Sequence, residues 1–384
     1  MPGEPQLESR HCGLADVSLY IHIPFCPSFC DYCDFYSETV KDGGRLDSFL
    51  TALIKDINYQ LEFFGIEKIV TAYIGGGTPS VLGVRRIRSL LDELGKLKCF
   101  SPVEFTIEAN PESADREFLT ACREGGITRL SLGAQSFHEP SRKSVNRAGS
   151  VITLEECLSL AGTIFPQAFC ADLLAGLPYQ TEEVITDDIK RLLEFKPSHV
   201  SLYSLVTEDG TPLEDKVKAK MLTLPDTDAA DNIWLAGKNA LVSAGFEHYE
   251  ISNFSAKGGR CLHNTRYWLM DSWLGAGPAA CGTVVDEKTG TALRFTYVHD
   301  TDAYMKNPII HNAVCEHLDR ITLIKESLLM GYRYMEGPDS RKFRSRFGIS
   351  AEECIPRTLE RWKEKDKMLY LNKFLTEAFC ELEM

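Results

Sequence analysis

The chain has 384 residues, of which 44% are hydrophobic and 25% are charged, so it is long enough for two or three globular domains with a sizeable core. Lys and Arg number 42 against 55 Asp and Glu, and the resulting net charge of −13 argues against a nucleic acid as partner. Thirteen cysteines, no apolar leader and no run of about 18 apolar residues predict a cytoplasmic protein without a transmembrane segment, while peripheral membrane contact stays open.

Strands and helices alternate along the first half of the chain, after a flexible tail expected at residues 1–15. The strands are predicted at residues 17–23, 69–74, 103–109, 129–135, 169–177 and 199–205. The helices between them are predicted at 46–64, 84–97, 115–124, in the stretch up to 164, and at 181–195. Six such units in line predict an α/β fold, a parallel sheet that curls into a partial (β/α)6 barrel over residues 16–224. Functional residues are then expected at the carboxyl ends of the strands.

The remaining residues, 225–384, are expected to form a mostly helical C-terminal domain. The pattern predicts a helix at 226–244, a strand at 248–254, and helices at 319–335, 339–347 and 351–367. The last of these suggest a winged-helix-like arrangement. From Asp339 to Met384, however, ten basic residues stand against nine acidic ones, so the charge gives no support to DNA binding.

Three cysteines follow the first predicted strand within eight residues. Cys26, Cys30 and Cys33 have the spacing C-x3-C-x2-C. Thiolates are soft ligands that select iron–sulfur clusters, zinc or copper(I), and three of them leave one coordination position open. A buried free cysteine is usually a small hydrophobic residue, but that is a poor explanation of three in one loop. The spacing therefore predicts a metal centre, most simply an iron–sulfur cluster.

A structural zinc ion is the main alternative to the cluster. It would need a fourth ligand, and no second cysteine pair follows at the spacing of a zinc finger. The nearby residues that offer one are Asp31, Asp34 and His22.

The loop resembles the cluster motif of the radical S-adenosylmethionine (SAM) superfamily, and the sequence YIHIPFC at 20–26 resembles its HemN/HemW branch. The resemblance implies that the three cysteines bind a [4Fe-4S] cluster whose fourth iron is chelated by the amino and carboxylate groups of SAM. The HemN oxidases carry a fourth cysteine two residues after the third. Phe35 stands there in this chain, as in the HemW proteins.

Glycine or polar residues also follow the next four predicted strands. The run GGGTPS at 75–80 lets the backbone approach a ligand, although a plain turn is the simpler interpretation. A buried and unpaired Glu108 would cost free energy, so the simpler interpretation is that its side chain faces solvent. A single arginine such as Arg147 is likewise usually exposed to solvent. The resemblance implies instead that these positions contact SAM. The residues it marks are Tyr20, Tyr32, Gly76, Gly77, Thr78, Glu108, Gln135, Arg147 and Asp172.

The sequence HNTRYW at 263–268 has two interpretations. The simpler one is a histidine satisfied within an aromatic packing site. The resemblance to a motif of HemW proteins implies instead that His263 contributes to heme binding, because imidazole is an ordinary axial ligand of heme iron. Cys281 stands where family members often have histidine, and cysteine also ligates heme iron. The identity of the heme ligand therefore stays open.

The resemblance implies two functions. The first is a heme chaperone that binds the cluster, SAM and heme and delivers heme to an acceptor hemoprotein, with an electron donor such as flavodoxin or ferredoxin. The alternative is an oxygen-independent coproporphyrinogen III oxidase, which removes CO2 from propionate side chains by SAM radical chemistry. Phe35 and the segment 263–268 favour the chaperone. A barrel stabilised by zinc is a third interpretation.

Overall fold

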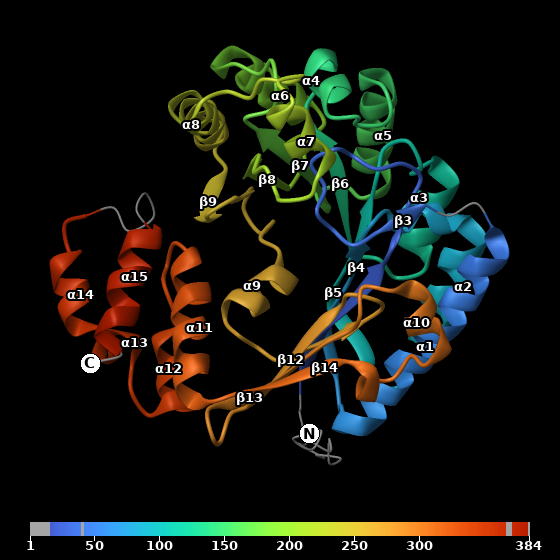
Figure 1. Cartoon of the computed structure of the whole chain (residues 1–384). Coiled ribbons are helices and arrows are strands. Elements are labelled where there is room, and N and C mark those ends of the chain that lie inside the picture. Colours follow the sequence, from blue (N-terminus) through green and yellow to red (C-terminus); the bar gives the residue numbers. More distant parts are fainter. Residues whose placement is uncertain (1–15, 40–41, 366–370, 383–384) are drawn as a thin grey trace.

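The computed structural model describes residues 16–39, 42–365 and 371–382 (Figure 1). The tail expected at 1–15 lies outside these residues. Figure 1 shows a sheet with helices on its outer side and a group of C-terminal helices beside it.

Twelve strands within the described residues pair in one sheet. Their bounds are β1 (Val17–Ile23), β4 (Ile69–Gly76), β5 (Phe100–Ala109), β6 (Arg129–Gln135), β7 (Phe169–Ala175), β8 (His199–Ser204), β9 (Glu247–Glu250), β10 (Asn253–Ser255), β11 (Trp273–Ala276), β12 (Cys281–Asp286), β13 (Thr291–Thr296) and β14 (Val314–Leu318). The spatial order is β14-β13-β12-β11-β1-β4-β5-β6-β7-β8-β10-β9. The six strands β1 and β4 to β8 are parallel neighbours in chain order, which confirms the predicted α/β architecture.

Helices cover the outside of this sheet and form the end of the chain. Their bounds are α1 (Gly43–Phe64), α2 (Gly83–Gly95), α3 (Arg116–Glu124), α4 (Glu139–Ser144), α5 (Val151–Ile164), α6 (Glu182–Glu194), α7 (Pro212–Lys218), α8 (Thr227–Ser243), α9 (Leu262–Trp268), α10 (Thr301–Lys306), α11 (Arg320–Arg333), α12 (Ser340–Phe347), α13 (Ala351–Cys354), α14 (Pro356–Arg361) and α15 (Leu371–Leu382). Two short 3-10 helices are η1 (Pro79–Leu82) and η2 (Ile310–Asn312).

Residue alternation along β1 separates the hydrophobic core from the barrel interior. Its fully buried apolar residues enter the main core: Val17, Leu19, Ile21 and Ile23. The alternate residues, which point to the opposite face, are Ser18, Tyr20 and His22. Thr71 and Tyr73 of β4 lie beside them, since the Thr71 hydroxyl donates to Ser18 and the rings of Tyr20 and Tyr73 are 6.2 Å apart. The barrel interior is thus polar and aromatic on this side.

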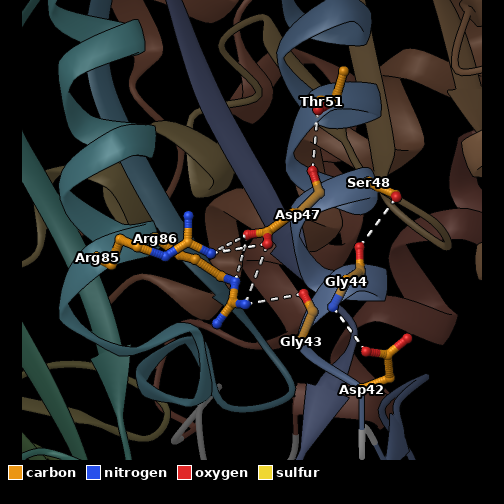
Figure 2. A network of polar contacts seen from close by, with 8 residues as sticks. All are labelled: Asp42, Gly43, Gly44, Asp47, Ser48, Thr51, Arg85 and Arg86. Atoms are coloured by element: carbon orange, nitrogen blue, oxygen red, sulfur yellow. Dashed lines mark hydrogen bonds and ion pairs between the residues drawn. The ribbon is translucent and has the colours of Figure 1, made fainter.

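A surface network of ion pairs joins α1 to α2 (Figure 2). Asp47 of α1 accepts from Arg85 at 2.6 and 2.8 Å and from Arg86 at 2.7 Å. Asp42 caps the start of the same helix by accepting from the Gly44 N–H at 2.9 Å. Asp47 is 46% exposed, so we assign each pair about 0–1 kcal/mol. The network orients the two helices, while the buried core beneath them supplies the stability.

The four strands β11 to β14 are a difference from the sequence-based prediction, which placed no strand between residues 273 and 318. They extend the sheet beyond β1, and β11 pairs with β1 in parallel. The run LGAGP at 274–278 is typical of a loop. Its glycine at 275 is required by packing, because a Cβ there would meet the Cys281 carbonyl oxygen at 2.3 Å.

The other sheet edge also differs in detail. The single strand predicted at 248–254 is two antiparallel strands, β9 and β10, because the Glu250 carboxylate accepts from the Ser252 N–H at 3.0 Å and closes a turn. β10 pairs with β8. The sheet therefore continues on both edges past the domain boundary expected at residue 224.

The C-terminal helices have a hydrophobic core of their own. Its buried members include Leu323, Leu328, Phe343, Trp362 and Phe374. The helix predicted at 351–367 is interrupted, because Pro356 lacks an N–H and begins a new helix, α14; residues 366–367 lie outside the described part. After β14 the described residues form helices and one isolated bridge, so no strand is present there as a wing.

None of the helices within the described residues is long and apolar enough to cross a lipid bilayer.

Candidate metal-cluster and SAM site

The loop that carries the three predicted cluster cysteines is held at both ends and in the middle. At its base, β2 (Phe25–Cys26) pairs with β3 (Glu38–Thr39). In the middle, the Asp31 N–H donates to the Val145 carbonyl and the Asp31 carbonyl accepts from the Leu213 N–H. The Asp31 carboxylate also pairs with Lys216 of α7. The loop therefore has a defined conformation at the carboxyl end of the barrel strands.

Each of the three thiols has its own hydrogen-bond donor. The Thr78 hydroxyl donates to Cys26 Sγ at 3.5 Å, and Arg147 Nη1 donates to Cys30 Sγ at 3.6 Å. The backbone N–H of Phe35 donates to Cys33. The pKa of Cys33 is raised to about 11, mainly by burial and to a smaller extent by the charges of Cys30 and Cys26. The three sulfurs thus lie near enough to affect one another.

The donor set fits an iron–sulfur cluster better than a single metal ion. Among residues 16–39, 42–365 and 371–382, no three His, Cys, Asp or Glu side chains converge closely enough to hold one ion. His22 donates from Nε2 to the Tyr36 carbonyl at 2.9 Å and accepts at Nδ1 from Tyr20 at 3.1 Å, so neither nitrogen is free for zinc. In a cubane, three thiolates bind three different irons and stay further apart.

Two of the predicted SAM residues, Gln135 and Arg147, meet a third polar side chain, Asn110, above Gly133 of β6. A Cβ on this glycine would lie 3.0 Å from each of Arg147 Nη2, Asn110 Oδ1 and Gln135 Nε2. Gln135 has a positive φ of 66°, which is uncommon for a residue other than glycine and typical of functional sites. Arg147 is buried and its Nε has no partner in the described residues. A buried cation with an unused donor is suited to a carboxylate.

Arg142 stabilises the position of the segment that carries Arg147 through hydrogen bonds to backbone carbonyls. Its guanidinium is 1% exposed and donates to the carbonyls of Ala134 at 2.7 Å, Ser136 at 3.0 Å and Ala148 at 2.9 Å. These carbonyls lie on both sides of α4. The end of β6 and the segment after α4 are therefore tied to one side chain, which places Arg147 over the barrel.

Glu108 of β5 faces the barrel interior and is paired there. Tyr73 Oη donates to Glu108 Oε1 at 2.7 Å, and the Gly76 N–H donates to Oε2 at 3.1 Å. The pKa of Glu108 is raised to about 7, mainly by burial and to a smaller extent by the nearby Asp172. A bound ammonium group would favour the ionised carboxylate. The alternative that Glu108 points to solvent is wrong.

The glycines at the end of β4 are needed for contacts within the protein. A Cβ on Gly76, whose φ is +109°, would lie 2.6 Å from the His22 ring. A Cβ on Gly77 would lie 2.6 Å from the Phe25 carbonyl oxygen. These glycines bring the end of β4 against the cluster loop. The Gly76 N–H is used by Glu108, so an anion would have to compete for it.

The remaining predicted SAM residues surround the same interior. Asp172 of β7 accepts from Ser131 at 3.2 Å and from the Cys170 thiol at 3.6 Å, and burial raises its pKa. Tyr20 lies beside Tyr73 with the two rings tilted by 32°. Burial and the adjacent Cys30 raise the pKa of Tyr32, and Arg147 lowers it, so the hydroxyl of this loop residue lies near both Cys30 and Arg147. The structure thus brings all nine positions to one end of the barrel.

His263 lies next to these residues, toward the start of the strands, and its ring centroid is 5.2 Å from that of Tyr73. It is 0% exposed and contacts Thr71 near the start of β4, through Nδ1 at 2.9 Å. Its Nε2 contacts Tyr267 Oη at 3.1 Å. Burial lowers the pKa of His263 to about 3, so the ring is neutral. Both nitrogens have partners, which supports the packing interpretation and leaves no nitrogen for heme iron in this conformation.

Cys281 lies near the same aromatic group. Burial raises the pKa of Tyr267, and the nearby Cys281 raises it to a smaller extent. The Cys281 carbonyl accepts from Trp273 Nε1 at 2.9 Å. It is half-buried at the start of β12, away from the cluster loop in sequence and in contacts.

The functional residue that sequence reasoning missed is Asn110. It accepts from Arg147 Nη2 at 2.8 Å and donates to Thr78 Oγ1 at 2.9 Å. The sequence signal was its place in the Glu-x-Asn-Pro pattern after the third predicted strand. Its role depends on two partners more than 30 positions away, which no local pattern shows.

Comparison with known proteins gives a consistent assignment. A profile of the Radical SAM superfamily matches residues 20–192. The heme chaperone HemW of Lactococcus lactis subsp. lactis is 31% identical over 338 residues, which cover 88% of this chain and 86% of that protein. The HemW of Escherichia coli K12 is 33% identical over 76% of each chain. The mouse mitochondrial protein named radical S-adenosyl methionine domain-containing protein 1 is 32% identical over 83% of this chain and 73% of its own.

One solved structure shares the fold over nearly the whole chain. The coproporphyrinogen III oxidase HemN of Escherichia coli superposes with a TM-score of 0.79, covering 97% of this chain and 91% of that one, at 20% identity. At that identity the likeness concerns the fold alone.

Proposed function

Because this chain belongs to the radical SAM superfamily, in the branch that contains HemW and HemN, we propose that it is a heme chaperone that holds a [4Fe-4S] cluster, SAM and heme and delivers heme to an acceptor hemoprotein. The observation that carries the proposal is the 31% identity to a HemW over most of both chains. Phe35, 70% exposed beside Cys33, supports the chaperone over the oxidase, because the oxidases carry a cysteine there.

The residues of the barrel end take separate roles in this proposal. Cys26, Cys30 and Cys33 hold the cluster. Arg147 offers its unused Nε to the carboxylate of SAM, and Glu108 offers a buried carboxylate to its ammonium group. When bound, the cluster and SAM supply one-electron radical chemistry, while the buried site excludes water around them.

We place the protein in a reduced compartment, the cytoplasm in the simplest case. The cysteines of the described part are all free thiols, as expected where disulfides are reduced. The name of the mouse relative assigns that protein to the mitochondrion, a compartment in which the same chemistry is also possible. A small electron-transfer protein such as flavodoxin or ferredoxin would supply the electron.

The first test concerns the cluster. Iron and acid-labile sulfide are measured after anaerobic reconstitution of the wild type, of Cys30→Ala and of Cys99→Ala. Cys99 is half-buried and lies before β5, outside the loop. We expect about four irons in the wild type and in Cys99→Ala, as one cubane requires, and a severe loss in Cys30→Ala. Zinc without iron in the wild type would overturn the proposal.

The second test separates the chaperone from the oxidase. Reconstituted protein is given dithionite, SAM and coproporphyrinogen III, and products are analysed by chromatography. We expect no protoporphyrinogen. In parallel, added heme should produce a protein-bound Soret band that is replaced by the Soret band of the acceptor on mixing with an apo-hemoprotein. Conversion of coproporphyrinogen would reverse the assignment in favour of the oxidase.

A further inference from the structure

A continuous belt of hydrogen bonds joins two of the three cluster thiols. Arg147 donates from Nη1 to Cys30 Sγ at 3.6 Å and from Nη2 to Asn110 Oδ1 at 2.8 Å. Asn110 Nδ2 donates to Thr78 Oγ1 at 2.9 Å, and Thr78 donates to Cys26 Sγ at 3.5 Å. The three linking side chains come from three different strand ends, those of β4, β5 and β6 with its following helix.

The orientation of the Asn110 side-chain amide sets the direction of each hydrogen bond in this belt. A guanidinium only donates, so the amide oxygen must face Arg147 and the amide NH2 must face Thr78. Since Thr78 Oγ1 accepts from that NH2, its own hydrogen is left for Cys26. The reverse amide orientation would set two donors against each other.

The belt is held in a fixed position at the Arg147 guanidinium. Arg147 is 8% exposed and its Nη2 also donates to the Gly133 carbonyl at 2.5 Å. The third thiol, of Cys33, takes a backbone N–H instead and stands outside the belt. Side-chain substitution therefore reaches the donors of Cys26 and Cys30 and leaves that of Cys33 in place.

We propose that Asn110 is a positioning residue that holds Thr78 and Arg147 as donors to the thiolates of Cys26 and Cys30, and thereby raises the reduction potential of the cluster. The inference rests on the proposed function, because it requires a cluster on these thiols. Donors to ligand sulfurs stabilise the form with more negative charge, which is the reduced cluster. The redox step is the uptake of one electron from an external reductant, without proton transfer or bond cleavage.

Asn110→Asp is the most informative variant, because it keeps the shape of the side chain and reverses the direction of its hydrogen bond with Thr78. Both carboxylate oxygens accept, so Thr78 turns its hydrogen to residue 110 and Cys26 loses its donor. The new carboxylate also pairs with Arg147 and weakens the positive field on Cys30. The cluster's midpoint potential, followed by electron paramagnetic resonance without SAM, should become more negative. We expect about a tenfold lower ratio of reduced to oxidised cluster at a fixed potential, which is 59 mV for one electron.

Matched variants distinguish the loss of a hydrogen-bond donor from a change of charge and from an effect on folding. Thr78→Val removes the hydroxyl without a change of charge and should lower the potential, whereas Thr78→Ser keeps the hydroxyl and should stay near the wild type. Asn146→Asp makes the same amide-to-acid exchange in an exposed side chain that donates to the Phe29 carbonyl at 2.8 Å, on the cluster loop but not on a sulfur. It should leave the potential nearly unchanged.

The outcomes distinguish this inference from the proposed function. If the wild type binds no iron and sulfide, the proposed cluster itself is wrong. If the cluster loads normally but Asn110→Asp and Thr78→Val keep the wild-type potential, the role of Asn110 is wrong and the cluster stands. A shift in Asn146→Asp equal to that in Asn110→Asp would show a general charge effect and overturn the belt.

Discussion

His263 is the middle of a chain of hydrogen bonds that runs across the barrel interior. Tyr267 donates to its Nε2, and its Nδ1–H donates to Thr71, whose hydroxyl donates in turn to Ser18 at 2.8 Å. Arg266 Nε also donates to Ser18 at 2.8 Å. The direction is set because Thr71 spends its hydrogen on Ser18 and must accept from the imidazole. At the residue scale, this histidine joins α9 to β1 and β4.

Replacing His263 by alanine should lower stability and leave heme binding unchanged. The change removes the hydrogen-bond partner of the Tyr267 hydroxyl and the imidazole donor to Thr71, which keeps its bond to Ser18, and this costs about 1–3 kcal/mol in the free energy of unfolding. Denaturant unfolding measures that cost, and heme titration followed at the Soret band measures affinity. Tyr267→Phe is the control that removes one bond and keeps the ring. Loss of the Soret band with unaltered stability would instead identify His263 as a heme ligand.

Asp56 shows how one buried carboxylate joins several elements. It lies on α1, is 0% exposed, and accepts from Gln60 at 3.0 Å, from Tyr304 of α10 at 2.8 Å and from Tyr297 after β13. Gln60 also donates to the Gly275 carbonyl of β11 at 2.9 Å. At the scale of elements, this cluster attaches α1 to the strands added beyond β1.

Asp56 should make stability depend on pH. Burial raises its pKa from 3.8 to about 6, and its hydrogen bonds only partly offset this. Between these values the folded state binds more protons at Asp56 than the unfolded state, so its contribution to the free energy of unfolding falls as pH rises from about 4 to about 6. The shift corresponds to a loss of about 3 kcal/mol at most.

Asp56→Asn removes this titration, so the stability of the variant relative to the wild type should increase between pH 4 and pH 7. Urea unfolding at several pH values measures the difference. A difference that is constant with pH would contradict the assignment.

A buried ion pair connects the barrel to the C-terminal helices at the scale of the whole molecule. Glu250 of β9 is 0% exposed and accepts from Arg333 of α11 at 3.0 and 3.1 Å. Its other oxygen accepts from Asn253 at 2.6 Å and from the Ser252 N–H at 3.0 Å. Beside it, Arg260 reaches both Glu247 and Glu336. The second hydrophobic core is thus joined to the main sheet through charges whose hydrogen bonds are satisfied.

Arg333→Ala should destabilise the protein by about 3 kcal/mol, because it leaves Glu250 buried and uncompensated. We take the low end of the range since Arg333 is 39% exposed. Adding Glu250→Gln to this variant removes the stranded charge and should recover part of the loss. Thermal or denaturant unfolding of both variants checks the cycle. Equal stability of single and double variants would show that the pair contributes little.

The sequence by itself determined the parts that depend on short-range patterns. Apolar periodicity located the six parallel strands and their helices, because a strand or helix must present one apolar face to the core. Spacing within one loop located Cys26, Cys30 and Cys33, and short motifs that resemble those of a known family marked Glu108 and Arg147. These features need only residues that are close in the chain, or a parallel order that follows the chain.

Only the tertiary structure decided the features that join distant segments. β11 to β14 extend the sheet because β1 has a free edge on the side away from β4, and the run at 274–278 that includes the end of β11 is by itself typical of a loop. The burial and hydrogen bonding of His263 depend on Thr71, 192 positions earlier, which meets its Nδ1. Asn110 became the centre of the thiol belt because three strand ends converge on it. A hydrogen bond requires its partners within about 3 Å, and that proximity is a property of the folded chain rather than of any local pattern.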